Sequence, residues 1–196
     1  MHNLTTTTRL KELLPQLFGE QKLKGDYYLR FRLTEQIAGL IDLKYVRESL
    51  TIQGDRITAV PNLSEYVIGL MSSRNQVFLA LDLAHLAGLP PETVNLRQYQ
   101  TIVLRTNSSD KFDRLVSNKD DNIDLFGLTV RKIEGINRIL SDRFIPVPEN
   151  LPQNLRPFVT SAVPLTSEKS ISTEAEKCSL LIDIERLIFN KISSPV

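Results

Sequence analysis

The sequence predicts a mainly β protein built from small barrel or sandwich lobes with a few short helices. Short apolar segments alternate with polar residues at strand spacing, and Gly, Pro, Asn and Asp separate these segments. Their order does not repeat the strand–helix–strand unit of a parallel α/β sheet. With 196 residues, 41% of them hydrophobic, the chain can bury a core as one domain or as two lobes.

The first strand is predicted over residues 26–33, where apolar and polar residues alternate. One face of this strand is expected to carry Tyr27, Leu29, Phe31 and Leu33. A second apolar segment, 37–43, follows at hairpin distance, so the two segments predict an antiparallel start to a sheet.

Residues 45–52 alternate in the same way, but with an acidic residue on the apolar face. Glu48 stands between Val46 and Leu50 at strand spacing. Because a carboxylate is costly to bury in a core, this pattern predicts a face that meets something other than the protein's own interior.

The next segment, residues 60–71, is predicted as a turn followed by a short helix. Asn62 or Ser64 is available as the N-cap of that helix. Four polar residues, 72–75, then form a compact turn with Arg74 near its tip. The turn raises the question of what an arginine does there without a catalytic partner nearby in the sequence.

After this turn, residues 76–83 are predicted as a strand and residues 84–91 as a short helix that ends at Gly88. Further strands are predicted over residues 99–106, 125–130, 158–165 and 178–184. Residues 132–140 predict a strand or a helical turn, and residues 183–192 predict a C-terminal helix.

The main domain is predicted over residues 26–192, with one segment before it and one polar insertion within it. An N-terminal helical extension is predicted over residues 1–25, where apolar residues share one helix face: Leu10, Leu13, Leu14, Leu17 and Phe18. This helix either docks on its own domain or binds a partner. The segment 107–124 is polar and too long for a tight connection, so it is predicted to be a surface insertion.

A short pattern occurs three times: apolar residues, then an aspartate, then an apolar residue. It places Asp42, Asp82 and Asp183 where a strand ends. For Asp82 and Asp183 a structural role is predicted, because a carboxylate at the start of a helix accepts its free N–H groups.

Composition and motifs argue against several classes of function. A net charge of +1 does not favour nucleic-acid binding, and no apolar run is long enough to span a bilayer. The single cysteine, Cys178, excludes an internal disulfide and fits a reducing, cytoplasmic location. Residues 120–131 resemble a calcium loop only in part, since Leu125 stands at the required glycine and Arg131 at the required glutamate. No cofactor or metal is expected.

An ordered set of segments resembles the CheW-like domain, the coupling adaptor of bacterial chemosensory arrays. The segments are YLRFRL, VRESL, ITAVPNLSEYVIGLMSSRNQVFLALDLAHLAGLP, TIVLR, FGLTVRKIEGI, FIPVPE and SLLIDIERLI. The resemblance runs from about Tyr27 to Ile192 and is most specific over residues 57–90. It implies two intertwined, five-stranded, SH3-like barrel lobes with a groove between them.

The resemblance also implies a non-catalytic role in signal transduction. Such an adaptor couples the regulatory domain of a CheA-type histidine kinase to the cytoplasmic tip of a chemoreceptor. It is cytoplasmic and is held near the membrane only through receptor arrays. It neither inserts into the membrane nor binds nucleic acid.

The resemblance implies a contact role for each residue that stands at a matching position of the family pattern. Receptor-binding positions are Val46, Glu48, Arg74, Ile133 and Ile136. Ile102 matches an apolar position associated with the kinase interface.

The chain departs from the family pattern in two places. Its turn reads Ser-Ser-Arg-Asn where the family has Asn-Leu-Arg-Gly, and Asn75 can adopt the left-handed conformation that the glycine supplies. Arg131 stands where the family usually has Asp, which reverses a charge near the groove. Two alternatives remain open: a scaffold repurposed outside chemosensing, and a hydrolase that uses His85.

Overall fold

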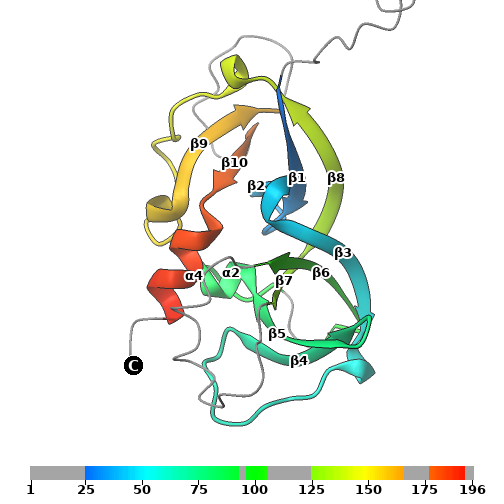
Figure 1. Ribbon diagram of the computed structural model, residues 1–196. Coiled ribbons are helices and arrows are strands. Elements are labelled where there is room, and N and C mark those ends of the chain that lie inside the picture. The colour runs from blue at the N-terminus through cyan, green and yellow to red at the C-terminus, as the bar shows by residue number, and fades with distance from the viewer. Residues whose placement is uncertain (1–24, 93–95, 106–124, 166–176, 193–196) are drawn as a thin grey trace, which may run out of the picture.

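Two five-stranded sheets form the molecule, and the chain passes from the first to the second and back again. The computed structural model describes residues 25–92, 96–105, 125–165 and 177–192. The prediction of a mainly β fold with two intertwined five-stranded lobes is confirmed (Figure 1). The predicted N-terminal extension, up to residue 24, and the predicted insertion lie outside the described residues.

Lobe A is the sheet formed by the two ends of the described chain, in the order β8-β1-β2-β10-β9. Its strands are β1 (Asp26–Arg32), β2 (Ala38–Asp42), β8 (Lys132–Ile139), β9 (Val159–Pro164) and β10 (Cys178–Ile182). Within residues 132–140, for which either a strand or a helical turn is predicted, the chain therefore forms strand β8. Short 3-10 helices, η3 (Ser141–Arg143) and η4 (Arg156–Phe158), lie in the connection between β8 and β9.

Lobe B is the sheet formed by the middle of the chain, in the order β3-β6-β7-β5-β4. Its strands are β3 (Val46–Gln53), β4 (Val67–Ser73), β5 (Gln76–Asp82), β6 (Gln98–Arg105) and β7 (Leu125–Val130). The 3-10 helix η1 (Leu43–Tyr45) joins β2 to β3 and so links the two lobes, and η2 (Gly54–Arg56) follows β3.

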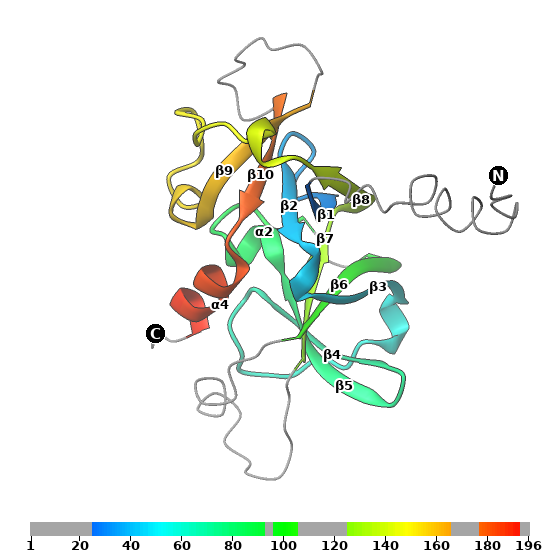
Figure 2. The ribbon, with the colours of Figure 1, turned by 45° about the horizontal axis from the view of Figure 1, so that its top comes forward.

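Two α-helices lie between the lobes, on the side away from β3 and β8 (Figures 1 and 2). They are α2 (Leu83–Leu86) and α4 (Ile184–Ile192), and they contact each other. The predicted capping aspartates are confirmed: Asp82 accepts the backbone N–H of His85, and Asp183 accepts that of Arg186, both at 3.0 Å. Asp42 caps η1 in the same manner.

The helix predicted within residues 60–71 is wrong, because strand β4 occupies Val67–Ser73. β4 pairs with β5 in a hairpin whose turn consists of Arg74 and Asn75. Pairing with β5 satisfies the backbone groups of β4, and this long-range partner is not visible in a local helix signal.

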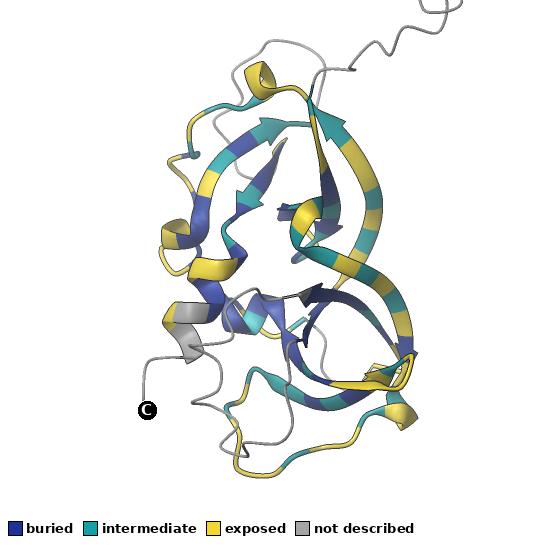
Figure 3. Ribbon diagram, viewed as in Figure 1, coloured by how far each residue is buried: buried dark blue, intermediate teal, exposed yellow. Residues whose placement is uncertain are grey.

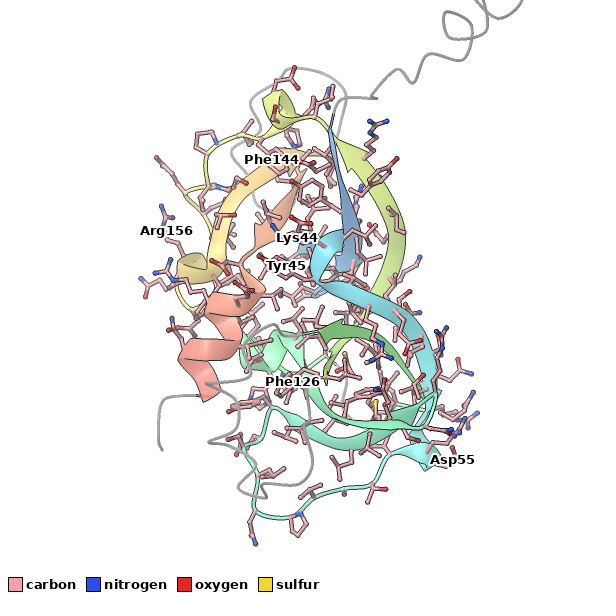
Figure 4. All side chains as sticks on the ribbon, viewed as in Figure 1. Lys44, Tyr45, Asp55, Phe126, Phe144 and Arg156 are labelled. Atoms are coloured by element: carbon pink, nitrogen blue, oxygen red, sulfur yellow. The ribbon has the colours of Figure 1, made fainter. Side chains whose placement is uncertain are left out.

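The face predicted for the first strand is wrong at its start. Tyr28 is 8% exposed and packs edge-on against Phe144, with ring centroids 5.5 Å apart, whereas Tyr27 is 51% exposed. Phe144 follows η3 and lies toward the top of Figure 4. Leu29 and Phe31 are buried as predicted. The neighbouring residues Tyr28 and Leu29 are both buried, so β1 is covered on both faces at that point and simple alternation does not apply there.

The two lobes repeat one pattern of strands. From the edge strand β8 or β3, each sheet has two antiparallel pairings, then a parallel one, then an antiparallel one. The lobes therefore correspond element by element. In lobe B the unit runs along the chain as β3-β4-β5-α2-β6-β7. In lobe A its counterpart is β8-β9-β10-α4, and β1-β2 from the start of the chain take the places of β6-β7.

Irregularities in the pairing recur at equivalent places, which fixes the correspondence residue by residue. An extra residue follows Val46 in β3 and follows Ile133 in β8, so these two residues are equivalent. Matching bulges also occur in β4 and β9. An isolated bridge pairs Thr58 with Leu70 in one lobe, and another pairs Ile145 with Ala162 in the other.

Two hydrophobic cores stabilise this arrangement. The larger core joins the lobes, since it contains Phe31 and Leu180 of lobe A together with Leu81 and Ile102 of lobe B. The smaller core is enclosed by lobe B and includes Phe78. Because the larger core is shared, the relative position of β3 and β8 is fixed by packing and not by a linker.

Candidate partner-binding face

Five of the six predicted site residues lie on β3, β8 and the tip of the β4–β5 hairpin. We call Val46, Glu48, Arg74, Ile133 and Ile136 the β3–β8 face. In both views, β8 and β3 follow one another along one side of the molecule (Figures 1 and 2). Exposed and partly buried residues alternate along most of β3 and along the first half of β8 (Figure 3).

Val46 and Ile133 are equivalent residues, one from each lobe. Each is partly buried and packs against the core that joins the lobes. The backbone N–H of Ile133 donates to the side-chain oxygen of Gln100 in β6, at 2.5 Å, so β8 is tied directly to lobe B. The sheet edges of the two lobes therefore present a matched apolar pair close to their junction.

Ile136 is the most exposed large apolar residue of the described chain, with 59% of its surface accessible. It lies on β8 opposite Leu29 of β1. β8 has β1 as its neighbour in the sheet and is an edge strand. An exposed isoleucine on such an edge is typical of a surface that pairs with or packs against another chain.

The extra residue of β8, Glu134, is held between two cations. Its carboxylate oxygens lie 2.7 Å from Nε of Arg30 and 2.7 Å from Nε of Arg32. Partial burial favours a higher pKa for Glu134, but the hydrogen bond from Arg32 and the charges of Arg30, Arg32 and Lys132 outweigh it and lower the pKa. The carboxylate therefore stays ionised beside the exposed Ile136.

The hairpin tip reaches β3 through an ion pair. Nε of Arg74 lies 3.2 Å from an oxygen of Glu48, whose side chain is 16% exposed. The Arg74 side chain is 77% exposed, so most of the guanidinium faces solvent. The carboxylate that was unexpected on an apolar face thus has a partner, supplied by a residue distant in sequence.

Arg74 also has an unusual backbone conformation. Arg74 has a φ of 48° and Asn75 a φ of 62°, both left-handed. Two such residues between paired strands are typical of a type I′ turn, which favours Asn-Gly. Arg74 therefore occupies a position that favours Asn, Asp or Gly, and where other residues cost about 1–2 kcal/mol.

Arg131, which reverses the charge usual in the family, is paired within the molecule. Its guanidinium donates to Glu92 at 2.8 Å and to Glu35 at 3.1 Å. The hydrogen bond with Glu92 and the charge of Glu35 raise the pKa of Arg131 above the ordinary value for arginine. Arg131 thereby joins the β1–β2 loop of lobe A to the segment after α2.

Ile102 lies apart from this face. It is in β6, between Ser49 of β3 and Leu128 of β7, and it is completely buried in the core that joins the lobes. A side chain with no exposed surface cannot contact a kinase directly. The structure therefore assigns Ile102 a packing role in the native fold.

The described residues offer little support for catalysis at His85. Its ring Nε2 lies 3.8 Å from a carboxylate oxygen of Glu65, and its backbone N–H donates to Asp82, the residue that caps α2. Cys178 is buried in β10, and burial raises the pKa of its thiol, which favours the unreactive protonated form. Among the described residues, no cluster of His, Cys, Asp and Glu could hold a metal ion.

No helix in the described part of the chain is long and apolar enough to cross a bilayer. The described surface has open depressions beside α2 and near the start of β1. Neither is lined by any of the six predicted site residues. The five residues of the β3–β8 face are thus separate from these depressions.

Some features of the site were not predicted from sequence. The cluster of Arg30, Arg32 and Glu134 joins residues distant in sequence, and local patterns give no sign of it. The equivalence of Val46 and Ile133 was also missed, although Val-Arg-Glu and Ile-Glu-Gly occupy matching positions.

Fold and surface together define a class: a double-barrel β domain whose notable feature is an exposed face of edge strands. The family model for the CheW-like domain matches residues 27–190. The chain therefore belongs to the CheW-like domain family, a family of non-catalytic chemotaxis scaffolds and adaptors.

Among solved structures, the fold is similar to that of the scaffolding protein TtCheW from Thermoanaerobacter tengcongensis. The TM-score is 0.59 at 17% sequence identity, and the match covers 84% of this chain and 92% of that protein. A comparison of the sequence with curated proteins finds no match.

Proposed function

We propose that this chain is a non-catalytic cytoplasmic adaptor that couples a CheA-type histidine kinase to the cytoplasmic tip of a chemoreceptor. Membership of the CheW-like family supports the general role. The observation that carries the receptor contact is the β3–β8 face, where exposed Ile136 lies beside the matched pair Val46 and Ile133.

The face has the composition that protein interfaces favour. Ile136 and the exposed parts of Val46 and Ile133 provide apolar contact, and Arg74 provides a charge at the rim. Arg74 is kept at a backbone position that disfavours it, and residues in strained conformations often have a functional reason. We propose that Arg74 selects the receptor and that the apolar residues supply most of the affinity.

We propose that the domain also contacts the kinase. We assign no side chain to that contact, because Ile102 is buried. The test is a pair of calorimetric titrations of the purified chain, one against the kinase regulatory domain and one against a receptor-tip fragment from the same organism. We expect saturable binding to both. Arg74→Glu should weaken receptor binding more than kinase binding, and equal loss of both would contradict the assignment of Arg74 to the receptor.

A second candidate function is a scaffold for partners outside chemosensing. The observation that favours it is Arg131, which holds Glu35 and Glu92 at a position where the family usually has Asp. If no kinase regulatory domain binds in the titration, this second function replaces the first.

A further inference from the structure

An open depression of about 980 Å³ lies beside α2, in lobe B. Its apolar lining comes from two segments: Leu63 and Tyr66 precede β4, and Leu86 and Leu89 belong to α2 and the turn after it. α2 and the β3–β8 face lie on opposite sides of the molecule (Figures 1 and 2). The depression is therefore separate from the receptor face proposed above.

The equivalence of the two lobes identifies the region of lobe A that corresponds to this depression. The sequence Asn-Leu-Ser-Glu-Tyr-Val before β4 matches Asn-Leu-Arg-Pro-Phe-Val before β9. The same hydrogen bond follows in each lobe: the N–H of Asp82 donates to the carbonyl of Tyr66, and the N–H of Asp183 donates to that of Phe158, both at 2.8 Å. Leu63 is thus the counterpart of Leu155.

These two leucines have opposite environments. Leu155 is completely buried in a cluster that contains Leu187 and Ile188 of α4, and α4 contacts η4. Leu63 is 46% exposed. The same apolar position is therefore covered in lobe A and open in lobe B.

The length of the following helix accounts for the difference. α4 continues for nine residues, whereas α2 has four and the chain turns away at Gly88, which has a φ of 77°. No helix in the described part of lobe B takes the place of the last turns of α4. The aspartate cap at the start of the helix is the same in both lobes.

We propose that this depression binds a short amphipathic helix of a partner protein, seated where lobe B lacks the counterpart of the later turns of α4. Two apolar side chains on one face of that helix pack against Leu63 and Tyr66. A basic side chain lies toward Glu65, whose carboxylate is 92% exposed at the rim, 3.8 Å from His85. This surface adds a third partner to the proposed adaptor and does not depend on the receptor or the kinase.

The test uses a fluorescein-labelled, helix-stabilised peptide with the sequence of residues 183–192, which is the chain's own example of such a helix. We expect it to bind the intact chain saturably in fluorescence anisotropy. Leu63→Asp should weaken binding at least tenfold, and Glu65→Lys should weaken it by a smaller factor. Ile136→Asp is the matched control, an exposed apolar residue on the opposite side, and should leave peptide binding unchanged.

Four results would overturn the proposal. Absence of saturation at millimolar peptide, or equal loss with Leu63→Asp and Ile136→Asp, would show that the depression does not recognise helices. Light scattering that finds self-association lost in Leu63→Asp would assign the surface to a second copy of the chain. Amide resonances of residues 1–24 that shift on Leu63→Asp would assign it to the chain's own N-terminal segment.

Discussion

Lobe A and lobe B share a strand pattern, equivalent bulges and equivalent helix caps. They differ in which of the equivalent residues are exposed at the surface. Lobe A buries its apolar positions under α4, and its bulge residue Glu134 is held by two arginines. Lobe B leaves Leu63 open and extends a tight hairpin whose Arg74 reaches Glu48. The repeated pattern thus sets the fold, while the differences between the lobes supply the surfaces proposed to bind partners.

The largest expected difference between the lobes is in stability. Leu155→Ala should lower the free energy of unfolding by about 2–5 kcal/mol, because it removes a completely buried side chain. Leu63→Ala, at the equivalent position, should change it by about 0.5 kcal/mol or less, because Leu63 is half exposed. Urea denaturation measures both, and equal losses would show that the two positions have the same environment.

The next effect concerns binding by the β3–β8 face. Ile136→Asp should weaken binding of the receptor tip by about tenfold or more, equivalent to about 1.4 kcal/mol, since it places a charge in an apolar contact. Leu63→Asp, on the other side of the molecule, serves as the control and should leave the calorimetric titration unchanged. Loss of receptor binding in the control alone would place the receptor contact in lobe B beside α2.

The hairpin of lobe B separates stability from function. Arg74→Gly relieves a left-handed residue but leaves the largely buried carboxylate of Glu48 without its partner, so the two effects oppose each other and stability should change by about 1 kcal/mol or less. Binding of the receptor tip should fall, because the guanidinium is gone. Thermal unfolding and titration together check this. A variant that binds as well as the native chain would show that Arg74 has no role in recognition.

The smallest effect is the pH dependence of Glu134. Its pKa in the folded protein is lowered, so its stabilisation is present above the unfolded pKa, near 4.5, and is lost as pH falls through the folded pKa. Native chain and Glu134→Gln should therefore differ by about 1 kcal/mol or less at pH 7 and converge in acid.

The equivalent bulge residue in lobe B, Arg47, provides the control for this measurement. Arg47→Gln should show no such convergence in urea denaturation between pH 3 and pH 7, because an arginine does not titrate in that range. A difference between native chain and Glu134→Gln that grows in acid would contradict the role assigned to the two arginines.

Most strands and both aspartate caps could be predicted from sequence because their signals are local. β4 could not, since the residues before it resemble a helix start and only pairing with β5 makes them a strand. Glu48 was visible as an anomaly, but its partner Arg74 depends on how the hairpin folds over β3. The repeat of the two lobes was hidden because β1 and β2 complete a unit that begins at β8.

The central claim is that edge strands from both lobes form one partner site. Amide hydrogen exchange of the chain with and without a saturating receptor-tip fragment tests it most directly. We predict slower exchange over residues 46–50 of β3 and residues 133–136 of β8 together, with residues 62–66 unchanged. Slower exchange confined to one lobe, or found at residues 62–66 instead, would contradict the claim.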